Sequence, residues 1–305
     1  MTEKYFITGG AGFVGSHTVD RLIREGAAVT VFDVKNWKEA ENLHNQKTNI
    51  TYIEGDIRDF EFLKKSMKGH THVLHLAAVV SVMESIEDPI TSHEVNVTGT
   101  LNVFESARLE GVTRVVYASS AAVYGNQDII PISEDAAISP QSPYGLHKSM
   151  NDSYATLYSD LFGLSTIGLR YFNIFGERQD PSSPYSGVIS IFVDRTKREE
   201  KITIFGDGSA TRDFIHVDNI VDANIRALSS IHQGVCNVGS GKETSLNMLI
   251  DALSVIYGRR IVPEYKEERS GDIMRSCPSI EKIHRLLAYT VIVDFNEGLT
   301  KLISA

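Results

Sequence analysis

The segment Thr8-Gly9-Gly10-Ala11-Gly12-Phe13-Val14-Gly15 decides the fold of this 305-residue chain. The apolar run Tyr5 to Thr8 predicts a strand before it, and the apolar spacing after it, closed by Gly26, predicts an amphipathic helix. Glycines in a G-x-x-G-x-x-G pattern let the backbone approach a pyrophosphate at the N-terminus of such a helix. The alternative is a tight turn that binds nothing. The loop predicts a dinucleotide site with contacts from Gly9, Gly12, Phe13, Val14 and Gly15.

Short apolar runs alternate with amphipathic stretches through the first half of the chain. This alternation predicts an α/β fold with a Rossmann-type, doubly wound parallel sheet. Turn-forming residues appear after Arg170, so we expect residues 1–170 to form a nucleotide-binding domain and residues 171–305 a smaller mixed α/β substrate lobe, with segments near 214–239 returning to the first domain. The expected strands are Tyr5 to Thr8, Val29 to Asp33, Ile50 to Glu54, His72 to Leu76, Val112 to Ser119 and Ser165 to Arg170.

Composition limits the classes of function. A formal net charge of -9 argues against general binding to nucleic acid or to a membrane surface, where a basic face supplies the affinity. Cys236 and Cys277 form neither a disulfide framework nor a paired metal-ligand spacing, so we expect no metal. The N-terminal apolar run is too short for a signal peptide and no segment approaches a membrane span, so the cytoplasm is the expected location.

Acidic residues follow two of the expected strands. Asp33 ends the second strand, where a carboxylate accepts hydrogen bonds from a ribose diol and repels a 2'-phosphate. NAD is therefore the expected cofactor rather than NADP. Asp56 and Ile57 follow the third strand, where we expect a contact with adenine. An ordinary loop acid is the alternative at both positions.

The segment Ser142-Pro143-Tyr144-Gly145-Leu146-His147-Lys148 places a phenol and an ammonium at i and i+4, on one face of an expected helix. Its serine suits the N-cap and its proline the first helical position. With Ser120 at the end of the fifth strand, Tyr144 and Lys148 form a set that moves a proton and a hydride at one carbinol carbon beside a nicotinamide. A free tyrosine has a pKa near 10, so we expect Lys148 and the nicotinamide charge to lower the pKa of Tyr144. Taken singly, each residue also has a purely structural explanation.

The order of these motifs resembles the extended short-chain dehydrogenase/reductase family, in its nucleotide-sugar branch. The resemblance covers nearly the whole chain and implies that Leu76, Ala77, Ala78, Asn96 and Tyr171 lie along the cofactor, while Lys148 also grips the nicotinamide ribose. The motifs that carry it are Gly9 to Gly15, His75-Leu76-Ala77-Ala78, Val95-Asn96-Val97-Thr98-Gly99-Thr100, Ser119 to Gly125, Tyr144 to Lys148, Arg170-Tyr171-Phe172-Asn173, Gly206 to Asn219 and Arg269-Ser270-Gly271-Asp272.

Members of this branch share the formation of a ketone at sugar C4 and differ in how that ketone then reacts. Dehydratases and decarboxylases of the family carry a carboxylate just after the catalytic hydroxyl, where this chain has Ala121 and Ala122. Without an acid there, the 4-keto sugar is reduced again, and reduction on the opposite face gives 4-epimerisation. The resemblance therefore implies a UDP-hexose 4-epimerase with tightly bound NAD.

The same resemblance implies a set of substrate residues. Arg212 and Arg269 match arginines that bind the UDP pyrophosphate, the alternative being surface salt bridges with Asp213 or Asp272. Positions that contact the uridine or the sugar in the family are Asn173, Val188, Phe205 and Asp272, of which Val188 and Phe205 could equally belong to the core.

Two features concern the identity of the sugar. The segment Arg178-Gln179-Asp180-Pro181 resembles the epimerase subgroup that acts on N-acetylated sugars, and Ser276 occupies a position beside the sugar C2 group in related epimerases. Related epimerases carry either a bulky aromatic or a small residue at the Ser276 position, and a small one leaves room for an acetamido group. We expect turnover of UDP-GlcNAc and UDP-GalNAc, with UDP-Glc and UDP-Gal as further substrates.

Several alternatives stay open. They are an epimerase for UDP-glucose alone, a UDP-glucuronate 4-epimerase, a nucleotide-sugar reductase or dehydratase, and an NAD(H)-sensing protein without catalysis. Relatives also pair into homodimers through the helices around residues 93–110 and 143–162, so a homodimer is expected by resemblance.

Overall fold

A computed structural model describes residues 3–180, 187–268 and 273–305. Seven parallel strands form its main sheet in the order β11-β6-β5-β4-β1-β2-β3, which confirms the predicted doubly wound Rossmann-type fold. All six expected strands lie in it, with small shifts at their ends. The strands are β1 (Lys4–Thr8), β2 (Ala28–Asp33), β3 (Ile50–Glu54), β4 (His72–His75), β5 (Arg114–Ser120), β6 (Thr166–Tyr171) and β11 (Gly234–Val238).

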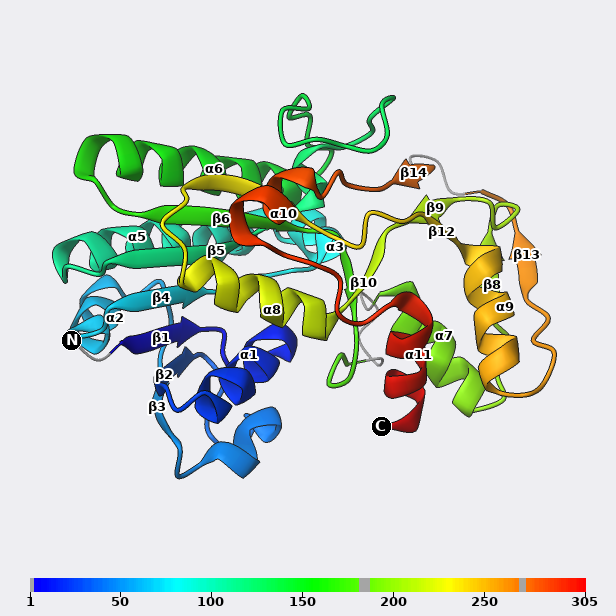
Figure 1. The fold of residues 1–305 in the computed structure, drawn as a ribbon, viewed down its shortest axis with the longest axis horizontal. Helices are drawn as coiled ribbons and strands as arrows, with labels where there is room; N and C mark the ends of the chain where they lie inside the picture. The colour runs from blue at the N-terminus through cyan, green and yellow to red at the C-terminus, as the bar shows by residue number, and fades with distance from the viewer. Residues whose placement is uncertain (1–2, 181–186, 269–272) are drawn as a thin grey trace.

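Helices cover both faces of this sheet (Figure 1). Side chains alternate along each strand, so Ile7 of β1 packs into the cluster that contains α1 and α8, while Phe6 packs into the cluster that contains α2, α5 and α6. The bounds are α1 (Phe13–Arg24), α8 (Val217–Leu228) and α10 (Glu281–Leu287) on the first face, and α2 (Phe60–Met67), α5 (Thr100–Leu109) and α6 (Pro143–Phe162) on the second.

Helix α6 begins and ends where local chemistry dictates. The Ser142 hydroxyl accepts a hydrogen bond from the backbone N–H of Gly145 at 3.1 Å, and Pro143 occupies the first turn. Gly163 closes the helix in the left-handed conformation with φ of 69°. The predicted helix and its N-cap are both confirmed.

A third core lies at the end of the molecule where α7, α9 and α11 gather (Figure 1). Its members include Phe175, Phe192, Phe214, Leu249 and Leu299. The elements of this part are β7 (Asn173–Phe175), α7 (Val188–Lys197), β8 (Thr203–Phe205), β9 (Thr211–Arg212), β10 (Phe214–His216), β12 (Thr244–Ser245), α9 (Leu246–Ile256), β13 (Glu264–Lys266), β14 (Arg275–Ser276) and α11 (Phe295–Ser304).

Short helical segments complete the first half of the chain. They are η1 (Glu41–Gln46), α3 (Val82–Glu87), α4 (Pro89–His93), the π-helical segment η2 (Glu94–Gly99) and η3 (Ala121–Val123). Within the described ranges, no helix is both long and apolar enough to cross a bilayer. The same ranges contain no group of three His, Cys, Asp or Glu side chains suited to a metal ion.

Candidate active site

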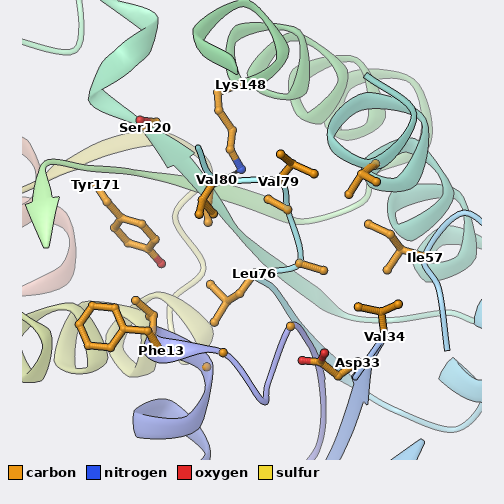
Figure 2. Close-up of a pocket in the computed structure, with 18 of the residues that line it drawn as sticks. Phe13, Asp33, Val34, Ile57, Leu76, Val79, Val80, Ser120, Lys148 and Tyr171 are labelled. Carbon is orange, nitrogen blue, oxygen red and sulfur yellow. Dashed lines mark hydrogen bonds between the residues drawn. The ribbon is translucent and has the colours of Figure 1, made fainter. Parts of the chain in front are cut away.

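A cavity of about 700 Å³ opens at the carboxyl ends of the parallel strands, where sites of such folds form. It brings together residues that the sequence spreads from the first glycine loop to β6 (Figure 2). The predicted residues that line it are Gly9, Gly12, Phe13, Val14, Gly15, Asp33, Asp56, Ile57, Leu76, Ala77, Ala78, Ser120, Tyr144, Lys148 and Tyr171.

The glycine loop forms a cradle of bare backbone. A Cβ on Gly15 would lie 2.3 Å from the carbonyl oxygen of Gly9, and one on Gly9, whose φ is +71°, would lie 2.6 Å from the backbone nitrogen of Ala77. Helix α1 starts after Gly12 with no side-chain cap and no acid in its first turn, so its N–H groups and dipole are free to meet an anion. These residues fit the pyrophosphate of a dinucleotide.

Asp33 is held by two backbone donors at the end of β2. Its Oδ2 accepts from Ala11 N at 2.9 Å and its Oδ1 accepts from Lys35 N at 3.1 Å, and the side chain lines the cavity. A carboxylate has lone pairs left for a ribose diol after two such bonds. Arg58, which also lines the cavity, hydrogen-bonds to Asp56 and so lowers the pKa of that carboxyl. This end of the cavity fits an adenosine with a free ribose diol.

The predicted Ser-Tyr-Lys set meets at the other end, where Figure 2 shows Ser120 and Lys148 across the cavity from Asp33. The Lys148 ammonium donates to the carbonyl oxygen of Ala118 at 2.8 Å and lies 5.7 Å from the centroid of the Tyr144 ring. The Ser120 hydroxyl acts on the Tyr144 phenol and lowers its pKa. The three groups can therefore act on one substrate oxygen.

Burial governs the protonation of this set. It raises the pKa of Tyr144, and the Ser120 hydroxyl opposes that rise. It lowers the pKa of Lys148 to about 8, and the charge of Asp152 opposes that fall. Burial thus raises the pKa of Tyr144 when the protein holds no cofactor. The expected lowering of that pKa by Lys148 together with the nicotinamide charge stays a prediction for the NAD-bound protein.

Asn96 supports the cavity through the backbone. Its Oδ1 accepts from Val79 N at 2.8 Å and its Nδ2 donates to Val79 O at 2.9 Å, and Asn96 is absent from the cavity lining within the described residues. Val79, by contrast, lines the cavity. Asn96 therefore holds a segment of the lining, and its place along the cofactor stays a prediction.

A buried chain of hydroxyls and one imidazole joins the loops under the cavity. The Thr100 hydroxyl donates to Asn96 O at 2.7 Å, so it accepts from His75 Nε2 at 2.9 Å, and His75 Nδ1 accepts from the Thr8 hydroxyl at 2.7 Å. Burial lowers the pKa of His75 to about 3, so the ring is neutral. The ends of β1 and β4 are thereby tied to η2 and α5.

Sequence reasoning missed other lining residues. Examples are Val79 and Val80, which lie next to a predicted motif. An apolar residue at such a position has no sequence pattern that marks it as part of a site, although Val80 is 69% exposed. Val34, Lys35 and Arg58 line the cavity as well, and the sequence pattern assigned them no role.

Apart from Ser120, the predicted substrate residues that are described lie outside the cavity lining. Ser276 pairs in register with Arg212 between β14 and β9. Asp213, which the sequence offered only as a salt-bridge partner, is fully buried, and its carboxylate accepts from the backbone N–H groups of Ser240 and Lys242. Its backbone O accepts from the Asn173 side chain at 3.0 Å and its N donates to Ser276 O at 2.8 Å. Asp213 thus gathers Asn173, Arg212 and Ser276.

Val188 and Phe205, two further predicted substrate residues, lie on other elements than Asn173, Arg212 and Ser276. Val188 begins α7 and packs against the third core, as its structural alternative stated, and Phe205 ends β8 half-buried. Arg269 and Asp272 lie outside the described residues.

Comparisons with known proteins agree with this geometry. The profile of the NAD dependent epimerase/dehydratase family matches residues 5–239. The UDP-glucose 4-epimerase of Mycolicibacterium smegmatis is 37% identical over 98% of this chain and 96% of its own length. The UDP-glucuronate 4-epimerase of Thermodesulfobacterium geofontis is 31% identical over 98% and 95%. The structure of UDP-N-acetylglucosamine 4-epimerase from Methanobrevibacter ruminantium with UDP-N-acetylmuramic acid is 36% identical and superposes with a TM-score of 0.95 over 100% of this chain and 98% of the other.

The Gly15→Ala variant tests the backbone cradle. Its new Cβ would lie 2.3 Å from Gly9 O, a backbone atom that cannot move aside, so we expect the purified protein to lose most of its NAD and about 1–3 kcal/mol of stability. NAD released by denaturation and urea unfolding provide the two measurements. Gly187→Ala is the control, because its Cβ meets Gln179 only at 3.4 Å. A Gly15→Ala protein with a full complement of NAD would contradict the cradle.

Proposed function

Because the chain belongs to the NAD dependent epimerase/dehydratase family, we propose that it is a UDP-hexose 4-epimerase acting on UDP-GlcNAc and UDP-GalNAc, and on UDP-Glc and UDP-Gal as well. The observation that carries this proposal is the meeting of Ser120, Tyr144 and Lys148 at one end of the cavity. Carboxylates in the described lining are Asp33 and Asp56, which belong to the adenosine end. Within the described lining, the end that holds Ser120, Tyr144 and Lys148 therefore has no carboxylate suited to removing water from the sugar.

We propose one role for each side chain. Tyr144 takes the proton of the C4 hydroxyl and later returns it to the oxygen of the inverted centre. Ser120 holds that oxygen by a hydrogen bond, and Lys148 holds positive charge beside the phenolate. NAD, when bound, supplies the acceptor and donor of the C4 hydride. Since both transfers reverse, the reaction needs no external oxidant.

We further propose a division of labour along the chain. Residues 1–170, with segments near 214–239, hold NAD, and residues 171–305 mainly hold the UDP-sugar. Asn173, Arg212 and Ser276, gathered by Asp213, are proposed to contact the substrate, together with Val188, Phe205, Arg269 and Asp272. The serine hydroxymethyl at position 276 is the feature that favours an N-acetylated sugar.

We also propose a homodimer through α5 and α6. These helices pack together and leave large apolar side chains exposed, an arrangement typical of an interaction face. The exposed residues are Leu109, Leu146, Leu157, Leu161 and Phe162.

The Tyr144→Phe variant tests the catalytic assignment. It removes the phenolic proton, so we expect kcat to fall by about 10²–10⁴-fold while NAD stays bound. The assay is proton NMR of UDP-Glc, UDP-GlcNAc and UDP-GlcA incubated with enzyme, and Tyr154→Phe on the same helix is the control. Net accumulation of NADH or of a dehydrated sugar would favour a reductase or dehydratase instead. Activity unchanged in Tyr144→Phe would refute the assignment, and a wild-type protein without activity would favour an NAD(H) sensor.

The Ser276→Tyr variant tests the sugar pocket. A phenol should fill the space proposed for the acetamido group, so turnover of UDP-GlcNAc should be lost while turnover of UDP-Glc persists. Ser276→Ala is the matched control and should keep both activities. Equal loss of both activities in Ser276→Tyr, or a wild type inactive on UDP-GlcNAc, would overturn the pocket argument.

A Leu157→Glu/Leu161→Glu variant tests the dimer. Two charges on the exposed face of α6 should convert the protein to monomers, as measured by light scattering after size exclusion. Ile231→Glu is the control, since Ile231 is 87% exposed and lies on a loop outside these helices. Wild-type protein of monomer mass would contradict the proposal.

A further inference from the structure

Helix α6 carries a third ionisable side chain one turn beyond the Tyr144–Lys148 pair. Tyr144, Lys148 and Asp152 follow at i, i+4 and i+8, so they share a face of the helix. The first two line the cavity, and Asp152 lies behind them in the core, 8% exposed. The roles proposed for Ser120, Tyr144 and Lys148 make no use of Asp152.

Two donors hold the Asp152 carboxylate in place. Tyr117 of β5 donates its phenolic hydrogen to Oδ1 at 3.0 Å, and Arg170 of β6 donates from Nε to Oδ2 at 2.9 Å. Arg170 is oriented in turn by Tyr124, whose hydroxyl accepts from Nη1 at 2.8 Å. Each carboxylate oxygen therefore has a fixed partner on the adjoining strands.

The ion pair between Asp152 and Arg170 is buried, with side chains 10% and 6% exposed. Burying two charges costs desolvation energy, and a pair of well-packed apolar side chains would often serve stability as well or better. Stability alone is thus a weak reason for a carboxylate at this position. Its charge can still act on Lys148, one turn away.

Lys148 interacts with two neutral imidazoles and one negatively charged carboxylate. Burial lowers the pKa of His75 in β4 to about 3, aided by the lysine charge, and that of His147 in α6 to about 4, aided by His93 and the lysine charge, so both are neutral. The Lys148 ammonium lies over the aromatic ring of Tyr144. Among the described residues, Asp152 is the charged group that raises the pKa of this ammonium against burial.

We propose that Asp152 is a positioning residue that keeps the Lys148 ammonium charged and aligned with Ala118 O, so that Lys148 can support Tyr144. This inference rests on the proposed function for its effect on catalysis. The carboxylate acts through space, because its two oxygens accept hydrogen bonds from Tyr117 and Arg170 rather than from the lysine.

The sign of the pH effect follows from this arrangement. Burial lowers the pKa of Lys148 to about 8, and Asp152 raises it. Removing the negative charge leaves burial unopposed, so the pKa of Lys148 falls further and the ammonium loses its proton at lower pH. The alkaline limb of the kcat profile should move to lower pH with it.

The Asp152→Asn variant provides the test. A downward shift of one pH unit in the alkaline limb lowers the protonated fraction of Lys148 at pH 8 by about fivefold and changes it little at pH 6. Asp152→Glu, which keeps the charge, should restore the limb. Tyr117→Phe and Tyr124→Phe remove hydrogen bonds around the ion pair but keep its charges, so they should leave the limb in place even if they lower stability.

A second readout separates this inference from the proposed function. Titration of the Lys148 side chain by ¹⁵N NMR, assigned with Lys148→Arg, reports its protonation whether or not any UDP-sugar is turned over. Should Asp152→Asn fail to fold, Asp152→Asn/Arg170→Gln removes both charges of the ion pair. A smaller downward shift is then expected, because the loss of the Arg170 charge offsets part of the loss of Asp152. An unchanged Lys148 midpoint in the folded variant would overturn the inference.

Discussion

The hydrogen bond from the buried Lys148 ammonium to the Ala118 carbonyl is the constraint on which the catalytic end of this protein depends. A buried ammonium needs an acceptor, and Ala118 supplies one from within β5. This contact sets how α6 sits against the strand. Ser120 ends that strand, and Tyr144 lies one helical turn before the lysine, so the same contact brings both to the cavity.

The cofactor end depends on backbone rather than on side chains. Gly9 lies against the backbone of Ala77, and Gly15 lies against the backbone of Gly9, so closely that any Cβ there would collide with main-chain atoms. Beneath this cradle, the neutral His75 ring forms hydrogen bonds with Thr8 and Thr100, and these bonds fix the loops that form the cradle. A rigid, uncapped helix N-terminus can then receive an anion without reorganising when the anion arrives.

Local signals made much of this structure predictable. Strand–glycine–helix order specified the sheet, and Ser142 with Pro143 specified the start of α6, because capping and periodicity are properties of neighbouring residues. Contacts between residues that are distant in the sequence could not be predicted from these local patterns. The pairing of Asp152 with Arg170, the action of Asn96 through Val79, and the gathering of Asn173 and Ser276 by Asp213 all arise from contacts between different elements of the fold. The net rise in the pKa of Tyr144 depends on burial, which spacing along a helix does not report.

Epimerisation of a UDP-hexose in D₂O tests the central claim most directly. In the proposed reaction Tyr144 exchanges the hydroxyl proton with the sugar, while the hydrogen on C4 leaves and returns without meeting solvent. NMR of the product should therefore show protium retained at C4 and no deuterium at C3 or C5. Deuterium incorporated at C4 would mean that the carbon-bound hydrogen passes through solvent, and the account of a closed, reversible transfer beside Tyr144 would be wrong.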